Sequence, residues 1–537
     1  MADHRAEPDP DTSTRLRLVS KPQVSGWRFM VHRLEHALIR RETAVRDDPQ
    51  KAQSTASIVG VVLAVIIVIG ATILSFFSPK GAIDKNTRIV ADNDTKAIYV
   101  HLEDGKLYPV TNLTSARLIV GSPLNPVNVK SSAIAKTPRG PLLGIAGAPG
   151  EMVPSSDSSS QWALCDTASE GSAVPLDTET GEPVDSSAGV TTAAIAGRLS
   201  SGVDTAMTLG PNDARLFVLG SQTWLLYREA SGLVVRSQVD MSDQAVVDAL
   251  GLSSVADATP VSTGLFNAVP ARPELSSPEV AGAGTVSSVS IGGERLDVGS
   301  VLRSETVSGP RYFVVLSGGI QQVSKTVAGV VQASGGGRGQ LKQVPADEVA
   351  QLARVHGLAV DHFPPEAVRV IDDKMLPVTC WRWGKNASDP AAGTEVLVGR
   401  ALPVTADQRE AMVSLVTGPT SGGRTVDQAY IPYATGRFVR VTGSDPTNLT
   451  KESLWWVSDT GVRFGISVDN AIDATDRTVA ALGIGNPVPA PWSVVKMFAI
   501  GPTLSQRDAR IRHDGMNLDS DGAALPTTRP GESVGSN

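Results

Sequence analysis

Residues 58–77 read IVGVVLAVIIVIGATILSFF, and no charged residue occurs between Lys51 and Lys80. A helix of this length, which rises about 1.5 Å per residue, crosses a hydrocarbon core of roughly 30 Å. A cleavable signal peptide has a shorter apolar region near the N-terminus, whereas about 50 residues precede this run and no clear small-residue cleavage site follows it. The sequence therefore predicts one membrane-spanning helix, within residues 54–78, that is kept as an anchor.

The charge differs on the two sides of this span. Residues 15–51 carry nine basic and four acidic side chains, although three basic residues just beyond the span partly offset this excess. Residues 1–51 sum to +2, which leaves −9 for the rest of the chain. Because Lys and Arg gather on the cytoplasmic side of membrane spans, we expect residues 1–53 to form a cytoplasmic stub and the acidic remainder to lie outside the cytoplasm.

The stub contains one amphipathic segment, VSGWRFMVHRLEHALIRRETAV at 24–45. Ser25 is a typical helix N-cap residue, and apolar side chains recur behind it at helical spacing. Such a helix could rest on anionic lipid or dock on a partner protein. We favour a partner protein, because Phe29 and Ile39 lie off the main stripe and provide a second apolar surface. The stripe that we expect to dock comprises Trp27, Val31, Leu34 and Leu38.

The composition excludes several function classes. Hydrophobic residues make up 41% of the 537 residues and charged residues 19%, which is typical of a folded chain of about three domains. A formal charge of −7 argues against a nucleic-acid partner, since such proteins need a basic face. Two cysteines and seven scattered histidines do not supply the clustered ligands of a zinc site, so we expect no metal and no other cofactor.

Motifs that carry catalysis are missing or isolated. Residues 32–36 match H-x-x-E-H, an inverted zinc-protease signature, but a stub with one helix supplies neither a third ligand nor a sheltered cleft. The run GGGRGQLK at 335–342 lacks the GK[ST] ending of a phosphate-binding loop, and there is no G-x-S-x-G nucleophile elbow. We found no carboxylate pair in an apolar setting. The sequence therefore indicates no catalytic residue, and a binding or structural protein is favoured over an enzyme.

The region after the span predicts an α+β fold that is mainly β, because short alternating runs of Val and Thr are separated by Gly and Pro turns. Four segments share an order of strand, glycine turn, second strand and helix-like stretch. Their unequal spacing predicts related modules with insertions around a central β domain, and the alternative is four unrelated hairpins. The turn glycines are Gly105, Gly232, Gly319 and Gly461.

The expected division of the chain follows from these patterns. It comprises the stub at 1–53, the transmembrane helix at 54–78, repeat modules at 88–150, 151–273, 285–343 and 441–512, a central β domain at 344–440, and a disordered tail at 513–537.

The two cysteines, Cys165 and Cys380, both follow the span. In an oxidising compartment an even pair is more often bridged than free, and the alternative is two unrelated buried thiols. A bridge between them would be structural, because isolated cysteines outside a C-x-x-C motif make poor redox catalysts.

Several longer stretches resemble the EccB family, the single-span membrane subunits of mycobacterial type VII (ESX) secretion systems. The resemblance runs nearly from end to end. It includes VSGWRFMVHRLEHALIRR at 24–41, NLTSARLIVG at 112–121, RGPLLGIAGAPG at 139–150, WALCD at 162–166, GLFNAVPA at 264–271, TCWRW at 379–383, LWWVSDTGVRFGI at 454–466 and APWSVVKMFAIGPTLSQRDA at 490–509.

This resemblance implies a cytoplasmic N-terminus, one helix in the inner-membrane bilayer, and an elongated periplasmic part with a disulfide between Cys165 and Cys380. It also implies assembly with EccC, EccD and EccE type subunits, of which EccC is the ATPase motor, and self-association through the periplasmic modules. The expected function is therefore a structural core subunit of the secretion complex. The alternative is an ATP-hydrolysing subunit with a non-Walker site, because the family often carries an ATPase label.

Overall fold

The computed structural model divides the chain into two compact units, Met1–Lys80 and Gly81–Asn537, and within its described residues the fold is mixed α+β and mostly β. The segment 1–14, and all but the first three residues of the expected tail 513–537, lie outside the described residues. The described residues are 21–40, 49–77, 83–84, 86–169, 189–200, 202, 205–252, 258–335, 341–386, 389–418, 424–443, 453–467 and 474–515.

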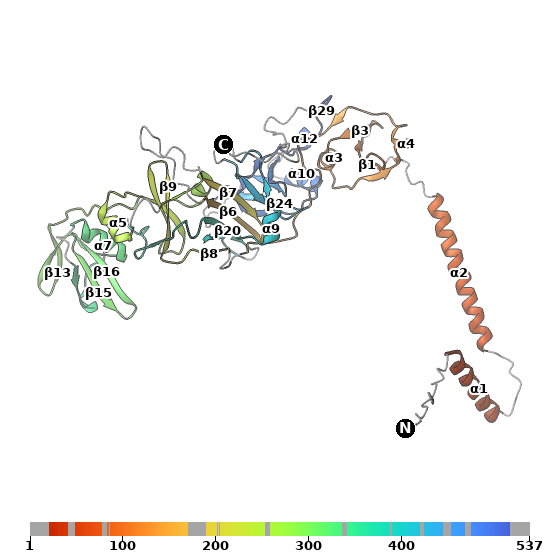
Figure 1. Ribbon diagram of the computed structural model, residues 1–537, viewed down its shortest axis with the longest axis horizontal. Helices are drawn as coiled ribbons and strands as arrows, with labels where there is room; N and C mark the ends of the chain where they lie inside the picture. Colours follow the sequence, from red (N-terminus) through yellow and green to blue (C-terminus); the bar gives the residue numbers. More distant parts are fainter. Residues whose placement is uncertain are drawn as a thin grey trace, which may run out of the picture. The chain divides into compact units, whose positions relative to one another are not determined.

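The N-terminal unit contains two helices, α1 (Lys21–Arg40) and α2 (Pro49–Phe77) (Figure 1). Within α2, Ser54–Thr72 is long and apolar enough to cross a membrane, with a mean hydropathy of 2.5. The helix α1 begins before Ser25, so the expectation that Ser25 caps it is wrong. Pro22 accounts for the earlier start, because proline is tolerated in the first turn, where its missing N–H would have no intrahelical acceptor.

The second unit contains four groups of elements with the same order. In each group three antiparallel strands precede a helix, and a fourth strand pairs parallel with the first. A later segment pairs parallel with the third strand of each group. The four groups therefore share one sheet topology.

The bounds of the groups follow the chain. The first group is β1 (Ile89–Asp92), β2 (Ile98–His101), β3 (Leu107–Val110), α3 (Leu113–Val120) and β4 (Val127–Val129). The second is β9 (Asp213–Leu219), β10 (Gln222–Arg228), β11 (Val234–Val239), α5 (Gln244–Leu250) and β12 (Thr259–Pro260). The third is β15 (Val301–Thr306), β16 (Gly309–Leu316), β17 (Gly319–Val323), α7 (Lys325–Ala333) and β18 (Leu341–Gln343). The fourth is β24 (Gly436–Thr442), β25 (Leu454–Ser458), β26 (Val462–Ile466), α10 (Ala474–Leu482) and β27 (Val488–Pro491).

Local sequence explains how each group turns. Gly105, Gly232 and Gly461 lie between the second and third strands with φ of 73°, 87° and 78°, a conformation that residues with a Cβ rarely adopt. In the third group the expected turn glycine, Gly319, is instead the first residue of β17. The helices that follow begin at N-cap side chains that accept a backbone hydrogen bond, namely Asn112, Asp243 and Ser324.

The groups pack in pairs through these helices. In the first and fourth groups, α3 contacts α10, and a shared core includes Leu118, Trp456 and Ala481. In the second and third groups, α5 contacts α7, and a shared core includes Leu225 and Val330. Each helix therefore buries its apolar face against the helix of another group.

A seven-stranded sheet lies beside these pairs, in the order β22-β23-β7-β6-β20-β21-β8. One face shares a core with strands of the second and fourth groups. The sheet draws on residues that we expected in two different domains, 151–273 and 344–440. Its strands are β6 (Ser160–Ala168), β7 (Val190–Ala196), β8 (Ala206–Thr208), β20 (Val378–Lys385), β21 (Gly393–Gly399), β22 (Val413–Ser414) and β23 (Gln428–Tyr430).

Alternation along β6 and β20 separates two cores. Trp162, Trp381 and Trp383 enter the large core on one face, whereas Cys165 and Cys380 enter a smaller core on the other. The two cysteines are opposite each other in the antiparallel ladder, with a Cα–Cα distance of 3.9 Å, and form a disulfide. The loop that this disulfide closes contains the second and third groups.

The remaining elements cover edges and faces. A hairpin of β13 (Val286–Ile291) and β14 (Glu294–Asp297) shares a core with the third group. After its fourth strand each group has a second short helix: α4 (Ser131–Ile134), α6 (Thr263–Ala268), α8 (Ala346–Ala350) and α11 (Trp492–Val495). The others are β5 (Leu142–Leu143), β19 (Arg369–Val370), α9 (Ala406–Glu410), β28 (Ala499–Ile500), α12 (Gln506–Ala509) and β29 (Arg512–His513).

Candidate interaction sites

The apolar stripe of α1 is open to solvent in the N-terminal unit. Trp27 is 69% exposed, Leu34 63% and Leu38 78%, and Val31 is exposed as well. Large apolar side chains that stay in water forgo roughly 1.5–3 kcal/mol each relative to burial. This surface is therefore suited to contact a membrane or another protein.

The H-x-x-E-H motif lies on the same helix. His32 Nδ1 is 3.1 Å from Glu35 Oε2, and both side chains are exposed. The side chain of His36 is outside the described residues. Across the described part of the chain, no group of three or more His, Cys, Asp or Glu side chains could hold a metal ion. His32 and Glu35 therefore have the contacts of an exposed surface pair.

A buried carboxylate joins the central sheet to the second group. Asp166, next to Cys165 on β6, accepts hydrogen bonds from the backbone N of Ser262 at 2.7 Å and from its hydroxyl at 2.8 Å. Ser262 is the N-cap of α6. Burial raises the pKa of Asp166 to about 6, against the hydrogen bonds from Ser262, and the nearby Asp427 adds to the increase. Sequence analysis missed this pair of carboxylates, because Asp427 is distant in sequence.

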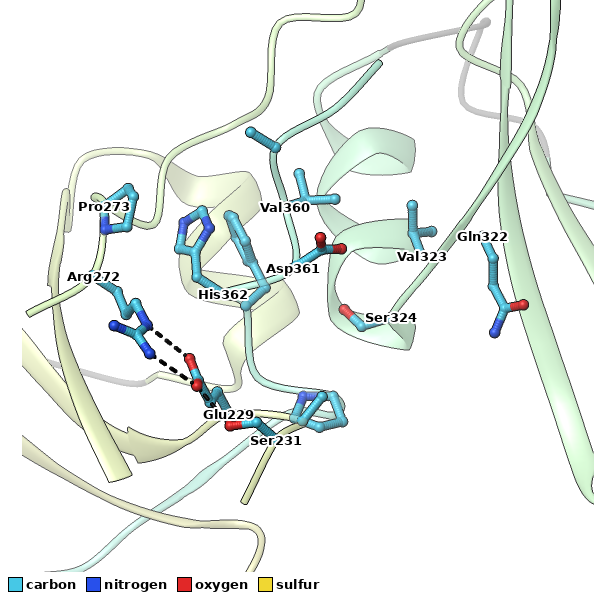
Figure 2. Close-up of a pocket in the computed structure, with 14 residues that line it drawn as sticks. Glu229, Ser231, Arg272, Pro273, Gln322, Val323, Ser324, Val360, Asp361 and His362 are labelled. Atoms are coloured by element: carbon cyan, nitrogen blue, oxygen red, sulfur yellow. Dashed lines mark hydrogen bonds and ion pairs between the residues drawn. The ribbon is translucent and has the colours of Figure 1, made fainter. Parts of the chain in front are cut away.

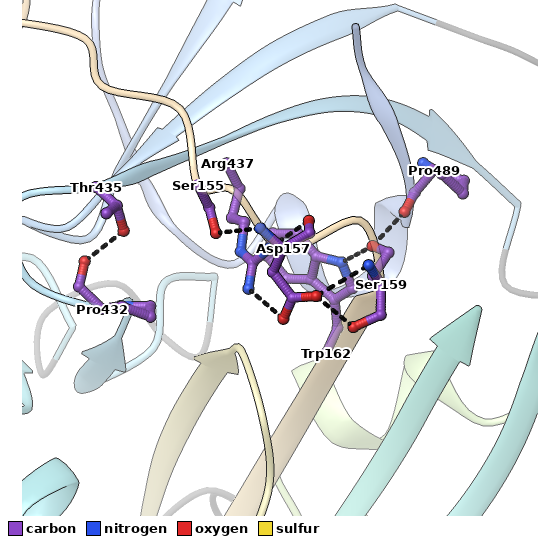
Figure 3. A network of polar contacts seen from close by, with 9 residues as sticks. Ser155, Asp157, Ser159, Trp162, Pro432, Thr435, Arg437 and Pro489 are labelled. Atoms are coloured by element: carbon purple, nitrogen blue, oxygen red, sulfur yellow. Dashed lines mark hydrogen bonds and ion pairs between the residues drawn. The ribbon is translucent and has the colours of Figure 1, made fainter. Parts of the chain in front are cut away.

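A second network of polar contacts connects the fourth group to the segment before β6 (Figure 3). The buried Arg437 donates to the backbone oxygen of Asp157 at 3.4 Å and lies 3.8 Å from its carboxylate. Burial acts to raise the pKa of Asp157, but hydrogen bonds from Ser159 and the charge of Arg437 lower it overall. Trp162 donates to Ser160, whose hydroxyl in turn donates to Pro489 O. This network ties β6 to both ends of the fourth group.

Arginine and aromatic side chains form two similar joints at the second short helices. Each guanidinium lies over two aromatic rings, at 3.7–5.2 Å from the ring centroids, and its Nε donates to a backbone carbonyl at 3.1 Å. The helices concerned, α6 and α11, contact each other. The two sets are Arg236 with Trp224 and Phe266, and Arg463 with Trp455 and Trp492.

A pocket of about 800 Å³ opens between the second and third groups (Figure 2). Its most polar wall holds Glu229, which forms a two-point ion pair with Arg272 at 2.9 and 3.1 Å and accepts from Ser231 at 2.6 Å. Burial acts to raise the pKa of Glu229, but the hydrogen bonds from Arg272 and Ser231 lower this pKa overall. The guanidinium of Arg272 is thus already engaged by a carboxylate, and a phosphate would have to displace Glu229 to form a two-point contact with it.

The residues expected to carry function lie in different units. Trp27, Leu34 and the rest of the stripe belong to the N-terminal unit, whereas Cys165 and Cys380 lie in the second. The joints at Asp166 and Arg437 and the pocket were not expected. They combine segments far apart in the chain, and no local motif in the sequence marks them.

Comparison with known proteins places these features in context. The family model described as type VII secretion system ESX-1, transport TM domain B, matches residues 16–518. The ESX-3 secretion system ATPase EccB3 of Mycolicibacterium smegmatis is 38% identical over 523 residues, which cover 96% of this chain and 95% of that protein.

Solved structures are similar as well. A chain in the structure of an intact ESX-5 inner membrane complex, a composite C3 model, is 34% identical with a TM-score of 0.70, covering 95% of this chain and 99% of that one. A chain of the EccB3 dimer from the ESX-3 core complex is 36% identical with a TM-score of 0.65, covering 79% and 100%. The likeness therefore extends over nearly the whole chain.

Proposed function

This chain belongs to the EccB family of type VII secretion proteins, and from this premise we propose that it works as a scaffold. It is a core subunit of a type VII secretion system, in the inner membrane with a periplasmic region. The observation that carries this conclusion is the likeness, over nearly the full length, to a chain of an intact ESX inner membrane complex. We propose that its partners are EccC, EccD and EccE type subunits, the lipid bilayer, and further copies of itself.

Co-purification tests this proposal. The full-length chain, tagged at its C-terminus and extracted from its native membrane in mild detergent, should bring down the three partner subunits in fixed ratios. A matched sample in which the tag is on an unrelated single-span protein controls for detergent carry-over. Recovery of the chain without any of these subunits would contradict the scaffold role.

The runner-up function is ATP hydrolysis, since relatives carry the name ATPase. The pocket between the second and third groups gives it little support, because Arg272 is paired with Glu229. The glycine-rich residues 336–340 lie outside the described residues. We expect purified full-length chain, freed of the motor subunit, to show no saturable ATP turnover above a mock preparation from cells that lack the chain. Turnover that follows the chain through successive columns would favour the enzyme.

We propose that the N-terminus is cytoplasmic. The basic excess before α2 supports this orientation. Both cysteines of the chain are joined in the disulfide, so a single introduced cysteine gives a clean reporter. In spheroplasts, a membrane-impermeant maleimide should label Val307→Cys at once and Arg28→Cys only after lysis. The reverse pattern would overturn the orientation, and lysed cells control for the intrinsic reactivity of each site.

We infer that the four groups are repeats of one module, arranged around a central β domain. Their common order of strands and helices supports this inference over four unrelated hairpins, because four strand pairings recur in the same sense in each group. The expected boundaries, with modules at 88–150, 151–273, 285–343 and 441–512 and the β domain at 344–440, remain proposals. Superposing the four groups in an experimental structure tests the inference, and pairwise agreement no better than that between unrelated hairpins would refute it.

A further inference from the structure

The loop that connects β23 to Gly436, the first residue of β24, has one aromatic side chain exposed to solvent. Tyr433 is 88% exposed, while Ile431 and Gly436 at the two ends of the loop are buried. Tyr433 therefore contributes almost no apolar burial to the folded chain. A phenol ring in this position gives the fold itself little free energy.

Hydrogen bonds fix this loop from several sides. Thr435 donates to Pro432 O from its backbone N at 3.2 Å and from its hydroxyl at 2.7 Å (Figure 3). The backbone N of Ala434 donates to Asp459 Oδ2 at 2.8 Å, across to the turn between β25 and β26. The backbone N of Gly436 donates to the carbonyl oxygen of Val153 at 2.9 Å. The tip that carries Tyr433 is thus closed by bonds within the loop and held to two other segments of the chain.

The backbone of this tip is strained. Ala434 has a φ of 55°, one of two non-glycine residues with positive φ within the described residues. For an L-residue with a Cβ this left-handed conformation is disfavoured, because the Cβ lies too close to a backbone carbonyl oxygen, and glycine would avoid that contact. Strain of this kind persists where the surroundings enforce it, and it is concentrated at functional sites. Here the strained residue follows the exposed Tyr433 directly.

We propose that Tyr433 is an anchor through which this chain contacts a second copy of itself. The inference rests on the proposed self-association and names a residue that carries it. Tyrosine is enriched among the side chains that dominate protein interfaces, and a loop held in its bound shape loses little entropy on binding. A second copy is the occupant because a similar chain occurs as a dimer in the ESX-3 core complex, and another occurs in an ESX-5 inner membrane complex described by a C3 model.

Two measurements on the full-length chain in detergent test the proposal. A dilution series followed by mass photometry gives the dissociation constant of the self-associated form. Tyr433→Ser should raise this constant about 30-fold, the effect of losing an anchor of about 2 kcal/mol. Tyr433→Phe, which keeps the ring, should raise it far less. Val307→Ser is the matched control, since Val307 is fully exposed on a different hairpin and should leave the constant unchanged.

The second measurement places a photo-cross-linking phenylalanine analogue at position 433 in cells that express two differently tagged copies. A cross-linked product that carries both tags supports the proposal. Products that contain only other subunits, or an unchanged dissociation constant for Tyr433→Ser, would overturn it while leaving the scaffold function intact. If the unsubstituted chain shows no self-association at any concentration, the proposed self-association itself fails, and the inference fails with it.

Discussion

The second and third groups form one pair, and the first and fourth groups form another. Both pairs are held by a contact between two helices, but the length of chain that connects the paired groups is very different. The second and third groups follow each other in the sequence, and α5 packs on α7 within one stretch of chain. The first and fourth groups are at opposite ends of the sequence of the second unit, yet α3 packs on α10 in the same manner. Bonds such as Arg117 Nη1 to Leu482 O, 3.5 Å, and the pairing of β29 with β5 close this second pair. The comparison shows that the same type of helix contact forms between groups that are adjacent in the sequence and between groups that are far apart in it.

The disulfide reduces this difference. Without it, about 305 residues separate the end of the first group from the start of the fourth, whereas the path through Cys165 and Cys380 is about 90 residues long. For a flexible chain, a roughly threefold shorter loop lowers the entropic cost of closure by about 1 kcal/mol. The covalent bond therefore encloses the local pair and also helps the distant pair to meet.

The largest expected effect is that of removing the disulfide. Cys165→Ala with Cys380→Ala should lower the free energy of unfolding by about 5 kcal/mol, the value that chain-entropy arguments give for a loop of 215 residues. Denaturant unfolding, followed by tryptophan fluorescence in a Trp27→Phe background, measures it. Hydrogen exchange should accelerate more in α3 and α10 than in α5 and α7, because only the first pair needs the long loop.

The unsubstituted chain, measured oxidised and then reduced in denaturant, controls for the loss of the sulfur atoms. Equal acceleration of exchange in both pairs would break the comparison, since connectivity would then have no separate influence on the distant pair.

The next largest effect on stability concerns only the pair formed by the second and third groups. A Cβ atom at Gly329 would lie 3.3 Å from Cβ of Ala249 on the facing helix α5. Gly329→Leu should therefore force α5 and α7 apart and destabilise the fold by roughly 1–3 kcal/mol. Gly318→Leu is the control, because a side chain there enters open space. We expect faster exchange in α5 and α7 with α3 and α10 unchanged, and a change of similar size in all four helices would contradict independent pairs.

The contributions of Asp166 and Asp157 to the free energy of unfolding should depend on pH in opposite directions. At the joint of the second group, the pKa of Asp166 is raised to about 6 from an ordinary value of 3.8. The folded state then binds the proton more tightly, so this contribution is full below pH 3.8 and is lost as the pH rises through 6. Between pH 7 and pH 5 the stability should increase by about 1.4 kcal/mol from this group, and Asp166→Asn should abolish the increase.

At the joint of the fourth group, the pKa of Asp157 is lowered, so its contribution is present above pH 3.8 and is lost as the pH falls through the folded-state value. Asp157→Asn should therefore change stability at pH 7 and leave the interval from pH 7 to pH 5 as in the unsubstituted chain. Thermal unfolding at pH 7, 6 and 5 separates the two acids. A flat profile for the unsubstituted chain would show that Asp166 titrates in its ordinary range.

Local patterns in the sequence predicted the features that single segments determine. The uncharged run at 58–77 became the apolar part of α2, and Gly105, Gly232 and Gly461 occupy turns, because chain length, hydropathy and positive φ are properties of short stretches. The mainly β fold class followed from alternation. The helix start was wrong, since Ser25 fits a cap by type and Pro22 fits a first turn equally well.

The contacts between segments could not be predicted in this way. Nothing near Asp166 in the sequence shows that α6 begins on its carboxylate or that Asp427 lies nearby, and β6 carries no sign that its partner is β20, more than 200 residues later. Alternation sets which face a residue occupies, but many registers satisfy the same alternation. The even number of cysteines favoured a bridge between Cys165 and Cys380, and the resemblance to a family implied it, but neither showed that the bridge joins β6 directly to β20.

The smallest expected effect on stability is that of the stripe on α1, and it bears most directly on the comparison. Both pairs in the folded unit cover their helices with other parts of the chain, whereas Trp27 and Leu34 are left open. Trp27→Ala with Leu34→Ala should therefore change the unfolding free energy of the chain by less than about 0.5 kcal/mol, as exposed substitutions do. If the stripe docks on a partner subunit, the same variant should lose that subunit from the complex on a native gel.

His32→Ala with Glu35→Ala, on the same helix, is the matched control, because it removes two exposed polar side chains that contact each other. We expect it to leave both stability and complex intact. A complex that survives the Trp27 and Leu34 substitutions would contradict docking of the stripe on a partner subunit. A loss of stability in the stripe variant would mean that α1 is covered within its own chain, as the helices of the two pairs are.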